Sequence, residues 1–389
     1  HAPRIPRATT TALRPLLLFS SVSLAAARTP FRPAFASASV ALNLRIRGGS
    51  AQRPSTGPSL ACAMSTDNKK RIGTHDGTFH CDEALACFLL KQTSTFKDST
   101  VTRTRDPAVL DSMDVVVDVG ATYEPEKHRY DHHQRGFEHT FDDAHKTKLS
   151  SAGLVYKHFG LEIIRGRLPS GDEGAAKLLY TKMYDNLIEE LDGVDNGVIN
   201  YPADVQPKYK VSTTLPQRVG GLNPYWNEEC SHEQMQERFE KAMEMAGGVF
   251  TSMLDYYIKA WMPARSVVVE ALEGRHKVDE SGQIMVLNSG CPWKEHLFDL
   301  EKELKVEKPI LYALFTDQSG NWRIQCVPSK PDGFENRKSM PEAWRGVRDE
   351  ALSELTGLPG CIFVHASGFI GGHATYEGVL AMARKSVAA

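Results

Sequence analysis

A cluster of histidines constrains this chain more than any other feature of its sequence. Seven of the fourteen histidines lie between residues 75 and 145, and two of them, His132 and His133, directly follow Asp131. The two imidazoles cannot point the same way from an extended or turning backbone, so one can bind a metal ion while its neighbour faces a substrate. The triplet begins thirteen residues after the end of the Val-rich run 114–118. We interpret this concentration of ligand-type residues as a metal site.

The first half of the chain alternates strand-like and helix-like patterns. A short strand at 70–75 enters a turn, and the spacing of apolar residues predicts a helix over 81–92. The run 114–119 is typical of a buried strand, and helices are predicted over 151–159 and 173–191. This alternation predicts a parallel sheet that presents its ligands in the loops after its strands.

The second half alternates again after a long helical pattern from 232 to 259, in which Gly247 and Gly248 could allow a bend. Helices are predicted at 292–303 and 375–384. Strands are predicted at 266–270, 283–287, 309–316, 321–327 and 361–365.

The length of 389 residues exceeds that of a usual domain, so we expect two. The predicted division is α/β throughout: a parallel-sheet metal domain at 66–215, a connection and linker helix at 216–261, and a second, smaller α/β domain at 262–389. A cleft between the two domains would hold the substrate.

Residues 1–65 have the composition of a targeting segment. Residues 1–66 contain eight Arg but no Lys, Asp or Glu, and Ser, Ala and Pro are frequent. This composition is typical of a transit peptide, which we expect to be disordered and exclude from the fold. We expect import into the mitochondrion or another organelle, whereas a product that starts at Met64 would stay in the cytoplasm or enter the nucleus.

The charge of the remaining chain argues against a general nucleic-acid binder. Removing those eight Arg from 46 Lys and Arg leaves 38, against 48 Asp and Glu, a net charge of −10. Such a body lacks the basic surface of a protein that binds nucleic acid along its whole length, although bound metal ions can reverse the sign of a local cleft. No apolar run approaches the roughly 18 residues that cross a membrane, so we expect no membrane partner. None of the seven Cys forms a CxxC pair, which favours reduced thiols.

Ligand-type side chains recur at the predicted strand and helix ends. They are His75, His80, Asp82, Asp118, Asp131, His132 and Asp195. Mixed carboxylate and imidazole ligands suit Mn²⁺, Mg²⁺ or Zn²⁺. This many candidates favours two ions over a mononuclear zinc hydrolase or a structural zinc site, and two ions can stabilise both the attacking and the leaving oxygen of a phosphoryl displacement. Cys81 offers a minor alternative, a Cys–His hydrolase.

Substrate-binding candidates lie further along the chain. Paired glycines before a helix let backbone N–H groups approach an anion, and a neighbouring histidine can add a donor. Gly371, Gly372 and His373 precede the final predicted helix in this way, and Arg323, Arg218 and Asn223 are further candidates.

Five elements in this order resemble the motifs of the DHH phosphoesterase superfamily, and the resemblance covers about residues 70–385. They are His75-Asp76-Gly77-Thr78-Phe79-His80-Cys81-Asp82-Glu83, Val115-Val116-Val117-Asp118, Asp131-His132-His133, Val194-Asp195-Asn196-Gly197 and Gly371-Gly372-His373. The opening from Gly73 and the stretch 218–224 are most similar to the melanocyte proliferating gene (UPF0160-type) exonuclease family.

That resemblance implies a metal-dependent 3′–5′ RNA exonuclease that uses two Mn²⁺ or Mg²⁺ ions, with Zn²⁺ possible. By the resemblance, His75, His80 and Asp118 hold one ion. Asp82, Asp118, His132 and Asp195 hold the other. Asp131 would then orient an imidazole, and His133 would contact the scissile phosphate.

Two departures from the superfamily, and two alternatives, accompany this hypothesis. His75 lies five residues before His80 rather than four, so Asp76 could take that ligand role instead. His80 stands where most members carry an Asp, which favours Mn²⁺ or Zn²⁺ over Mg²⁺. One alternative is a phosphatase of small substrates, such as pyrophosphate or a short or cyclic dinucleotide. The other is a non-catalytic, metal-dependent RNA-binding or regulatory protein. The oligomeric state stays open.

Overall fold

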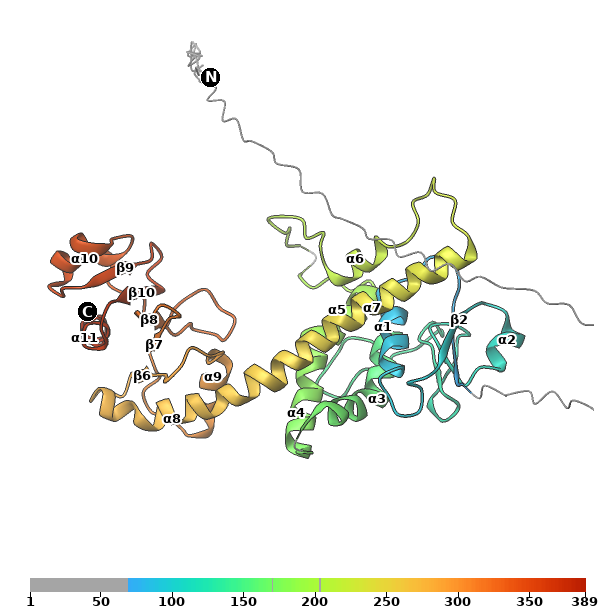
Figure 1. The fold of residues 1–389 in the computed structure, drawn as a ribbon, viewed down its shortest axis with the longest axis horizontal. Helices are drawn as coiled ribbons and strands as arrows, with labels where there is room; N and C mark the ends of the chain where they lie inside the picture. Colours follow the sequence, from blue (N-terminus) through green and yellow to red (C-terminus); the bar gives the residue numbers. More distant parts are fainter. Residues whose placement is uncertain (1–68, 170, 203) are drawn as a thin grey trace, which may run out of the picture. The chain divides into compact units, whose positions relative to one another are not determined.

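The computed structural model describes residues 69–169, 171–202 and 204–389 (Figure 1). The predicted targeting segment, 1–65, lies outside these residues. The part of the chain that is described forms two five-stranded sheets, with helices before, between and after their strands. The α/β class expected from the sequence is confirmed.

The first sheet has the strand order β2-β1-β3-β5-β4. Its strands are β1 (Arg71–Thr74), β2 (Thr100–Arg103), β3 (Val115–Val117), β4 (Tyr123–Glu124) and β5 (Arg129–Tyr130). β1 runs parallel to β2 and β3, and β3 runs parallel to β5. Because parallel strands end at the same edge of a sheet, the residues that follow three of them, His75, Asp118 and Asp131, emerge together.

The helices of this half are α1 (Cys81–Leu90), α2 (Pro107–Asp111), α3 (Ser151–Arg167), α4 (Glu173–Met183), α5 (Glu189–Asp195) and α6 (Leu215–Gly220), with a 3₁₀ turn at Pro125–Lys127 and a π-helical turn at Tyr184–Ile188. α1 is central: nine of its ten residues are buried, and it packs against α3 and α7 (His232–Tyr256). A helix that is apolar on all sides is stable only when neighbours enclose it. The start of α1 is thereby fixed against the sheet edge.

α7 continues without interruption through a π-helical turn (Tyr257–Trp261) into α8 (Met262–Val278). Gly247 serves close packing: a Cβ there would lie 2.2 Å from the Phe88 ring. The prediction of a strand at 266–270 is wrong, because these residues lie in α8. Consecutive valines favour a strand locally, but Ala264, Val268 and Leu272, spaced four apart, are buried on one face of the helix, and that packing overrides the local preference.

The second sheet has the strand order β6-β7-β8-β10-β9. Its strands are β6 (Ile284–Val286), β7 (Tyr312–Thr316), β8 (Trp322–Cys326), β9 (Cys361–Val364) and β10 (Ile370–His373), and its helices are α9 (Lys294–Glu303), α10 (Asp349–Thr356) and α11 (Tyr376–Ala388), with a 3₁₀ turn at Glu342–Trp344. β6 and β7 are parallel, and the other neighbouring pairs are antiparallel. Gly371 and Gly372 lie within β10 and not at the entry to α11, so the predicted helix-entry geometry is wrong.

A buried carboxylate ties α3 to α5 behind the sheet edge. Asp192 accepts hydrogen bonds from the backbone and hydroxyl of Ser150, from the backbone of Gly153 and from the hydroxyl of Tyr184. Burial raises the pKa of Asp192 to about 7, against the opposing effect of these donors. A Cβ at position 153 would lie 2.3 Å from the Asp192 carboxylate, so the close contact requires glycine.

Replacing Gly153 by Ala is therefore expected to lower the free energy of unfolding by about 3 kcal/mol, through overpacking and loss of buried hydrogen bonds. Gly166 in the same helix is the matched control, since a Cβ there would meet nothing within 4 Å. Gly166→Ala should stabilise the helix by about 0.5–1 kcal/mol. Denaturant unfolding of both variants measures the difference, and equal stabilities would contradict the close packing.

Candidate metal centre

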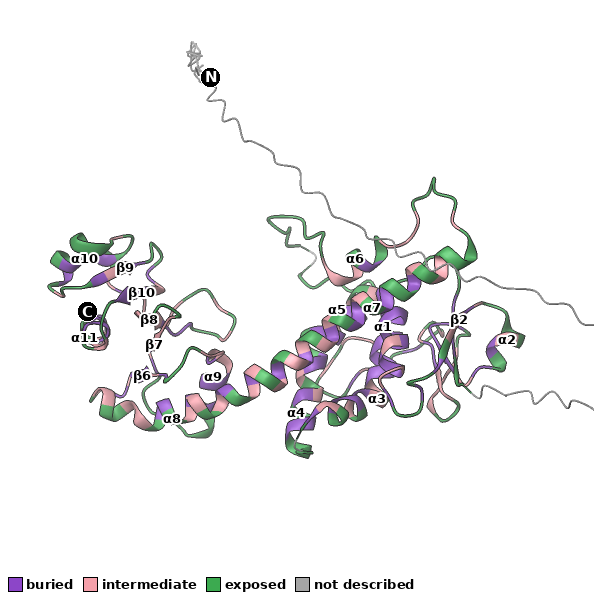
Figure 2. Cartoon of the chain, in the orientation of Figure 1, coloured by how far each residue is buried: buried purple, intermediate pink, exposed green. Residues whose placement is uncertain are grey.

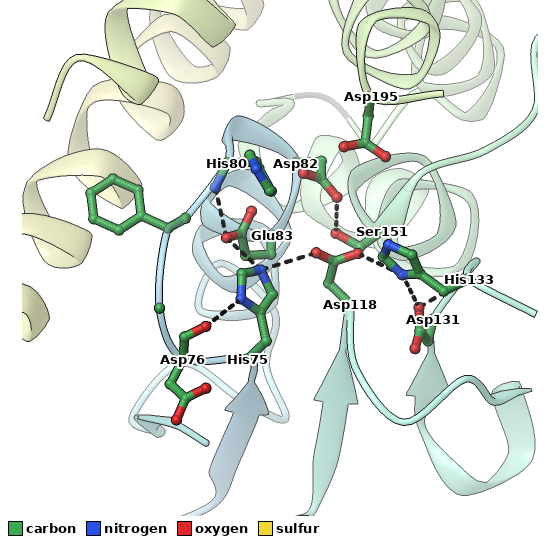
Figure 3. A network of polar contacts seen from close by, with 12 residues as sticks. His75, Asp76, His80, Asp82, Glu83, Asp118, Asp131, His133, Ser151 and Asp195 are labelled. Atoms are coloured by element: carbon green, nitrogen blue, oxygen red, sulfur yellow. Dashed lines mark hydrogen bonds and ion pairs between the residues drawn. The ribbon is translucent and has the colours of Figure 1, made fainter. Parts of the chain in front are cut away.

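The loop after β1 delivers the first group of side chains to the sheet edge. His75 is buried, and its Nδ1–H donates to the carbonyl oxygen of Asp76 at 2.9 Å, so Nε2 is the ring atom that faces the site and could bind an ion once it has lost its proton. Glu83, in the first turn of α1, accepts from the backbone N–H of His80 at 2.8 Å, and its Oε1 lies 3.0 Å from Nε2 of His75. The loop and the helix start thus converge on one point (Figure 3).

Two side chains from other elements hold this loop in place. Arg103, at the end of β2, donates to the carbonyl oxygen of Gly77 at 2.6 Å and lies over the Phe239 ring. The Asn223 side chain accepts from the backbone N–H of Phe79 at 3.0 Å and donates to its carbonyl oxygen at 2.8 Å. Phe79 directly precedes His80, so these contacts set the position of the His80 side chain.

Asp118 lies at the centre of the site. It follows β3 with a φ of +58°, a left-handed conformation that non-glycine residues adopt rarely and that often occurs at functional sites. Its carboxylate faces two ways: Oδ2 lies 3.4 Å from Nε2 of His75, and Oδ1 lies 3.4 Å from Nε2 of His132. One buried carboxylate therefore separates two imidazoles, which is the arrangement of a bridging ligand.

The triplet Asp131-His132-His133 lies on the side of Asp118 that is opposite to His75. Asp131 accepts from the backbone N–H of Ala121 at 2.6 Å, and its Oδ1 lies 2.7 Å from Nδ1 of His133. The His132 ring is nearly buried and points towards Asp118 and Asp195, whereas the His133 side chain is 60% exposed. The two neighbouring histidines thus face different surroundings, as the sequence predicts.

Asp82 and Asp195 complete the centre from two helices. Asp82, in the first turn of α1, is buried and accepts from the hydroxyl of Ser151 at 2.7 Å. Asp195, at the end of α5, has its Oδ2 3.0 Å from Nε2 of His132. Figure 3 shows both carboxylates turned towards the space beside Asp118.

Three overlapping sets of side chains bring their ligand atoms within 4.8 Å of one another. The sets are His75, His80, Glu83 and Asp118; then Asp118, His132 and His133; then His80, Asp82 and Asp195. Asp118 and His80 each belong to two sets. The structure therefore gathers every predicted ligand at one site, but it adds Glu83 and His133 and groups His80 with Asp82 and Asp195 as well as with His75.

The pKa values of the buried histidines and carboxylates show that the site favours positive charge. Burial alone would lower the pKa of His75 and His132, but contacts with Asp118 and with Glu83 or Asp195 raise each to about 10. Burial would raise the pKa of Asp118, yet the two histidines lower it to about 2. Burial and the neighbouring carboxylates raise the pKa of Asp82 well above its usual value.

The residues present fit one or more divalent ions. Two buried carboxylate oxygens at the site, Oδ1 of Asp82 and Oε2 of Glu83, have no hydrogen-bond partner. Nε2 of His132 meets only the carboxylates of Asp118 and Asp195. Buried polar atoms are normally satisfied, so unpartnered oxygens and an imidazole nitrogen around one point mark a place for a cation. Oxygen and nitrogen donors without thiolates suit Mn²⁺, Mg²⁺ or Zn²⁺.

Glu83 is the residue that reasoning from sequence missed. It lies in the quoted first motif, but its position three residues after His80 is typical of a helix-capping residue. It does cap α1, and its second oxygen still faces the site. A buried acid at a helix start, next to two predicted ligands, was the available signal.

The predicted substrate-binding residues of the second half come together in its sheet. Gly372 on β10 pairs with Arg323 on β8, and a Cβ on Gly372 would meet the Arg323 guanidinium at 2.6 Å. Arg323 forms an ion pair with Asp317 and lies over the Phe363 ring. His373 is buried, its Nδ1 accepts from the backbone N–H of Thr375 at 3.0 Å, and burial lowers its pKa. Gly371 precedes Gly372 in the same strand.

Arg218 and Asn223 occupy different surroundings near the first sheet. Arg218 is exposed on α6, whereas the Asn223 side chain is hydrogen-bonded to the backbone N–H and carbonyl oxygen of Phe79. Their roles in substrate binding stay predictions.

Cys81 is a poor nucleophile. Its thiol is buried, and burial together with the charges of Asp82 and Glu83 raises its pKa far above neutrality. A thiolate is the reactive form, so this site does not support Cys–His hydrolysis.

A mostly parallel sheet, with β4 antiparallel to β5 at one side, gathers acids and imidazoles at the carboxyl ends of its parallel strands. These features define an α/β protein with a candidate centre for divalent ions. Comparison with known proteins then gives the family. Residues 71–387 match the model of the uncharacterised protein family UPF0160, MYG1 exonuclease, and the chain belongs to this family.

Relatives from distant organisms align over most of both chains. A MYG1 protein from Dictyostelium discoideum is 52% identical over 81% of this chain and 96% of its own. The MYG1 exonuclease of Homo sapiens is 51% identical over 82% of this chain and 86% of its own. A pGpG-specific phosphodiesterase of known structure aligns with 82% of this chain and 100% of its own at 13% identity, with a TM-score of only 0.26. Within the described residues, no helix has the length and apolarity needed to cross a bilayer.

Proposed function

We propose that this chain is a divalent-metal-dependent phosphodiester hydrolase that removes nucleotides from the 3′ end of RNA. The observation that carries the proposal is Asp118, a buried carboxylate that faces a separate imidazole with each of its oxygens. Membership of a family whose relatives are named exonucleases supports the nuclease part.

In this proposal the ions would be held by His75, His80, Asp82, Glu83, Asp118, His132 and Asp195. Mn²⁺ or Mg²⁺, or else Zn²⁺, would supply Lewis acidity at the phosphate and make water a better nucleophile. The chain's own contribution is orientation. The Asp76 carbonyl oxygen fixes the tautomer of His75, and Ser151 holds one oxygen of Asp82.

His133 would contact the scissile phosphate. Its Nδ1–H donates to Asp131, which fixes the ring and directs Nε2 outwards from a side chain that is more than half exposed. The bond to Asp131 raises the pKa of His133, against the effect of its burial. A protonated imidazole near neutral pH can donate to a phosphate oxygen, and Asp131 acts by positioning it.

The second sheet would grip the phosphate chain through Gly371, Gly372, His373 and Arg323. Division of the chain into domains at 66–215 and 262–389, and import into an organelle directed by residues 1–65, are further proposals. One observation favours the small-substrate alternative: residues 67–389 carry a net charge of −10, and long RNA prefers basic tracks.

A metal-supplemented assay decides among these functions. The wild-type chain with Mn²⁺ should shorten a 5′-labelled single-stranded RNA step by step and should hydrolyse pyrophosphate slowly. Asp131→Ala should be about 10–100-fold slower on RNA, because the His133 ring loses its orientation. Faster hydrolysis of pyrophosphate would favour the phosphatase, and RNA binding without any cleavage would favour the non-catalytic alternative.

A further inference from the structure

The connection between α5 and α6 is an exposed strip of chain. Every described residue in 197–202 and 204–213 is exposed, and the described part of 198–214 forms neither helix nor strand (Figure 2). We call residues 204–213 the strap. Loops that run over the surface often carry binding residues on a scaffold that positions them.

The strap presents an aromatic ring between two cations. Tyr209 is 77% exposed, and its neighbours Lys208 and Lys210 are exposed as well. None of the three side chains makes a hydrogen bond or ion pair to another described residue. A large aromatic side chain in this state has no role in the core, so its surface is available for binding.

The chain on either side of the strap is fixed at the candidate metal centre, on one side by Asp195 and on the other, beyond α6, by Asn223. Lys208 lies thirteen residues after Asp195, whose carboxylate contacts His132 at 3.0 Å. Lys210 lies thirteen residues before Asn223, whose side chain is hydrogen-bonded to Phe79. The strap therefore leaves the site from one candidate ligand and returns beside another.

The charge of this segment is opposite to that of the body. Residues 196–226 contain Lys208, Lys210 and Arg218 and a single acid, Asp204, a net charge of +2. Residues 67–389 as a whole carry −10. A short basic segment that is joined along the chain to a site rich in carboxylates favours a polyanionic occupant that contacts both.

We propose that the strap binds the single-stranded RNA substrate upstream of the cleaved nucleotide. Tyr209 stacks on a base, and Lys208 and Lys210 contact the flanking phosphates. Every base has a face that can stack, so this contact holds RNA without preference for sequence, as an exonuclease requires. The inference rests on the proposed function and adds a binding site that lies outside the ligand set.

Steady-state kinetics on two substrates test the strap. A 12-nucleotide RNA is long enough to contact the centre and the strap, whereas bis(p-nitrophenyl) phosphate reports on the centre alone. Tyr209→Ala should raise KM on the RNA about tenfold or more and leave kcat unchanged. Lys208→Ala/Lys210→Ala should reduce the slope of log binding constant against log salt by about 1.4. All these variants should hydrolyse the small ester like the wild type.

Conservative and matched variants separate stacking from general damage. Tyr209→Phe should bind RNA like the wild type, and Tyr209→Leu should resemble Tyr209→Ala, because stacking needs a ring and not apolar bulk. Lys97→Ala/Lys177→Ala removes two exposed lysines elsewhere in the same half and should leave the salt slope unchanged.

The outcomes distinguish this proposal from the function on which it rests. If the wild type cleaves RNA and the strap variants match it in KM and salt slope, the strap is not an RNA site, while the exonuclease proposal stands. If the strap variants change only the mass of the protein in sedimentation, the strap is a contact between copies, and the RNA site is refuted. If the wild type neither binds nor cleaves RNA, both proposals fail together.

Discussion

Replacing Asp118 by Asn is expected to abolish phosphodiester hydrolysis, with kcat lower by at least about 10³-fold, equivalent to about 4 kcal/mol of lost transition-state stabilisation. The substitution removes the one carboxylate that faces both His75 and His132. It does so without refolding the turn, because Asn tolerates the left-handed backbone at this position about as well as Asp does. Rates on RNA and on bis(p-nitrophenyl) phosphate should fall together.

The same strand supplies the matched control. Asp114 precedes β3 as Asp118 follows it, and it binds Lys70 and the backbone N–H of Arg71 at the opposite edge of the sheet. Asp114→Asn should keep full activity. Activity of Asp118→Asn within tenfold of the wild type would remove the bridging role and the mechanism built on it.

Chelation is expected to inactivate the protein, and the stabilisation that Mn²⁺ restores should grow with pH. Without metal, the raised pKa of about 10 means that His75 and His132 hold protons in the folded state. Their contribution to stability is complete below the unfolded pKa of about 6.5 and declines as pH rises towards 10. Metal binding must displace these protons, so apparent affinity should rise by up to about tenfold per pH unit for each histidine. Melting temperatures with and without Mn²⁺ between pH 6.5 and 8.5 measure the effect.

Two histidine variants show which protons are involved. His132→Gln should weaken this pH dependence by about one proton. His145→Gln is the control: the pKa of His145 is also raised, against its burial, by Asp142 and Asp185, but these groups lie outside the sets of ligand-type side chains. A stabilisation by Mn²⁺ that is the same at every pH, or a His145 variant that behaves like the His132 variant, would contradict the proposed ligands.

The convergence of the candidate ligands could be predicted because it follows from strand order. A Val-rich run is buried on both faces, parallel neighbours end at the same edge, and Asp118 directly follows such a strand. Asp131 follows β5, which is parallel to β3 but has only two residues and was not predicted from the sequence. Asp195 belongs to the motif Val194-Asp195-Asn196-Gly197 on which the resemblance rests, and the structure places it at the site, whereas the nearby Asp192 is buried in hydrogen bonds between α3 and α5.

The other features of the fold and the site depend on contacts between distant residues, which local sequence patterns do not predict. The tilt of α1 decides that Glu83 faces the centre while it also caps the helix. Packing decides that 266–270 is helical and that Gly371 and Gly372 lie in a strand beside Arg323. The hydrogen bonds from Asn223 to Phe79 join residues 144 positions apart, a distance that no local pattern spans.

The central claim is that side chains in α1 and α5 and in the loops after β1, β3 and β5 hold two divalent ions through a shared Asp118. Anomalous scattering from crystals grown with Mn²⁺ tests it most directly. We predict two peaks about 3.5–4 Å apart, both in contact with the Asp118 carboxylate, one beside His75 and one beside His132. A map without a peak at Asp118, or with manganese bound only elsewhere, would contradict the account.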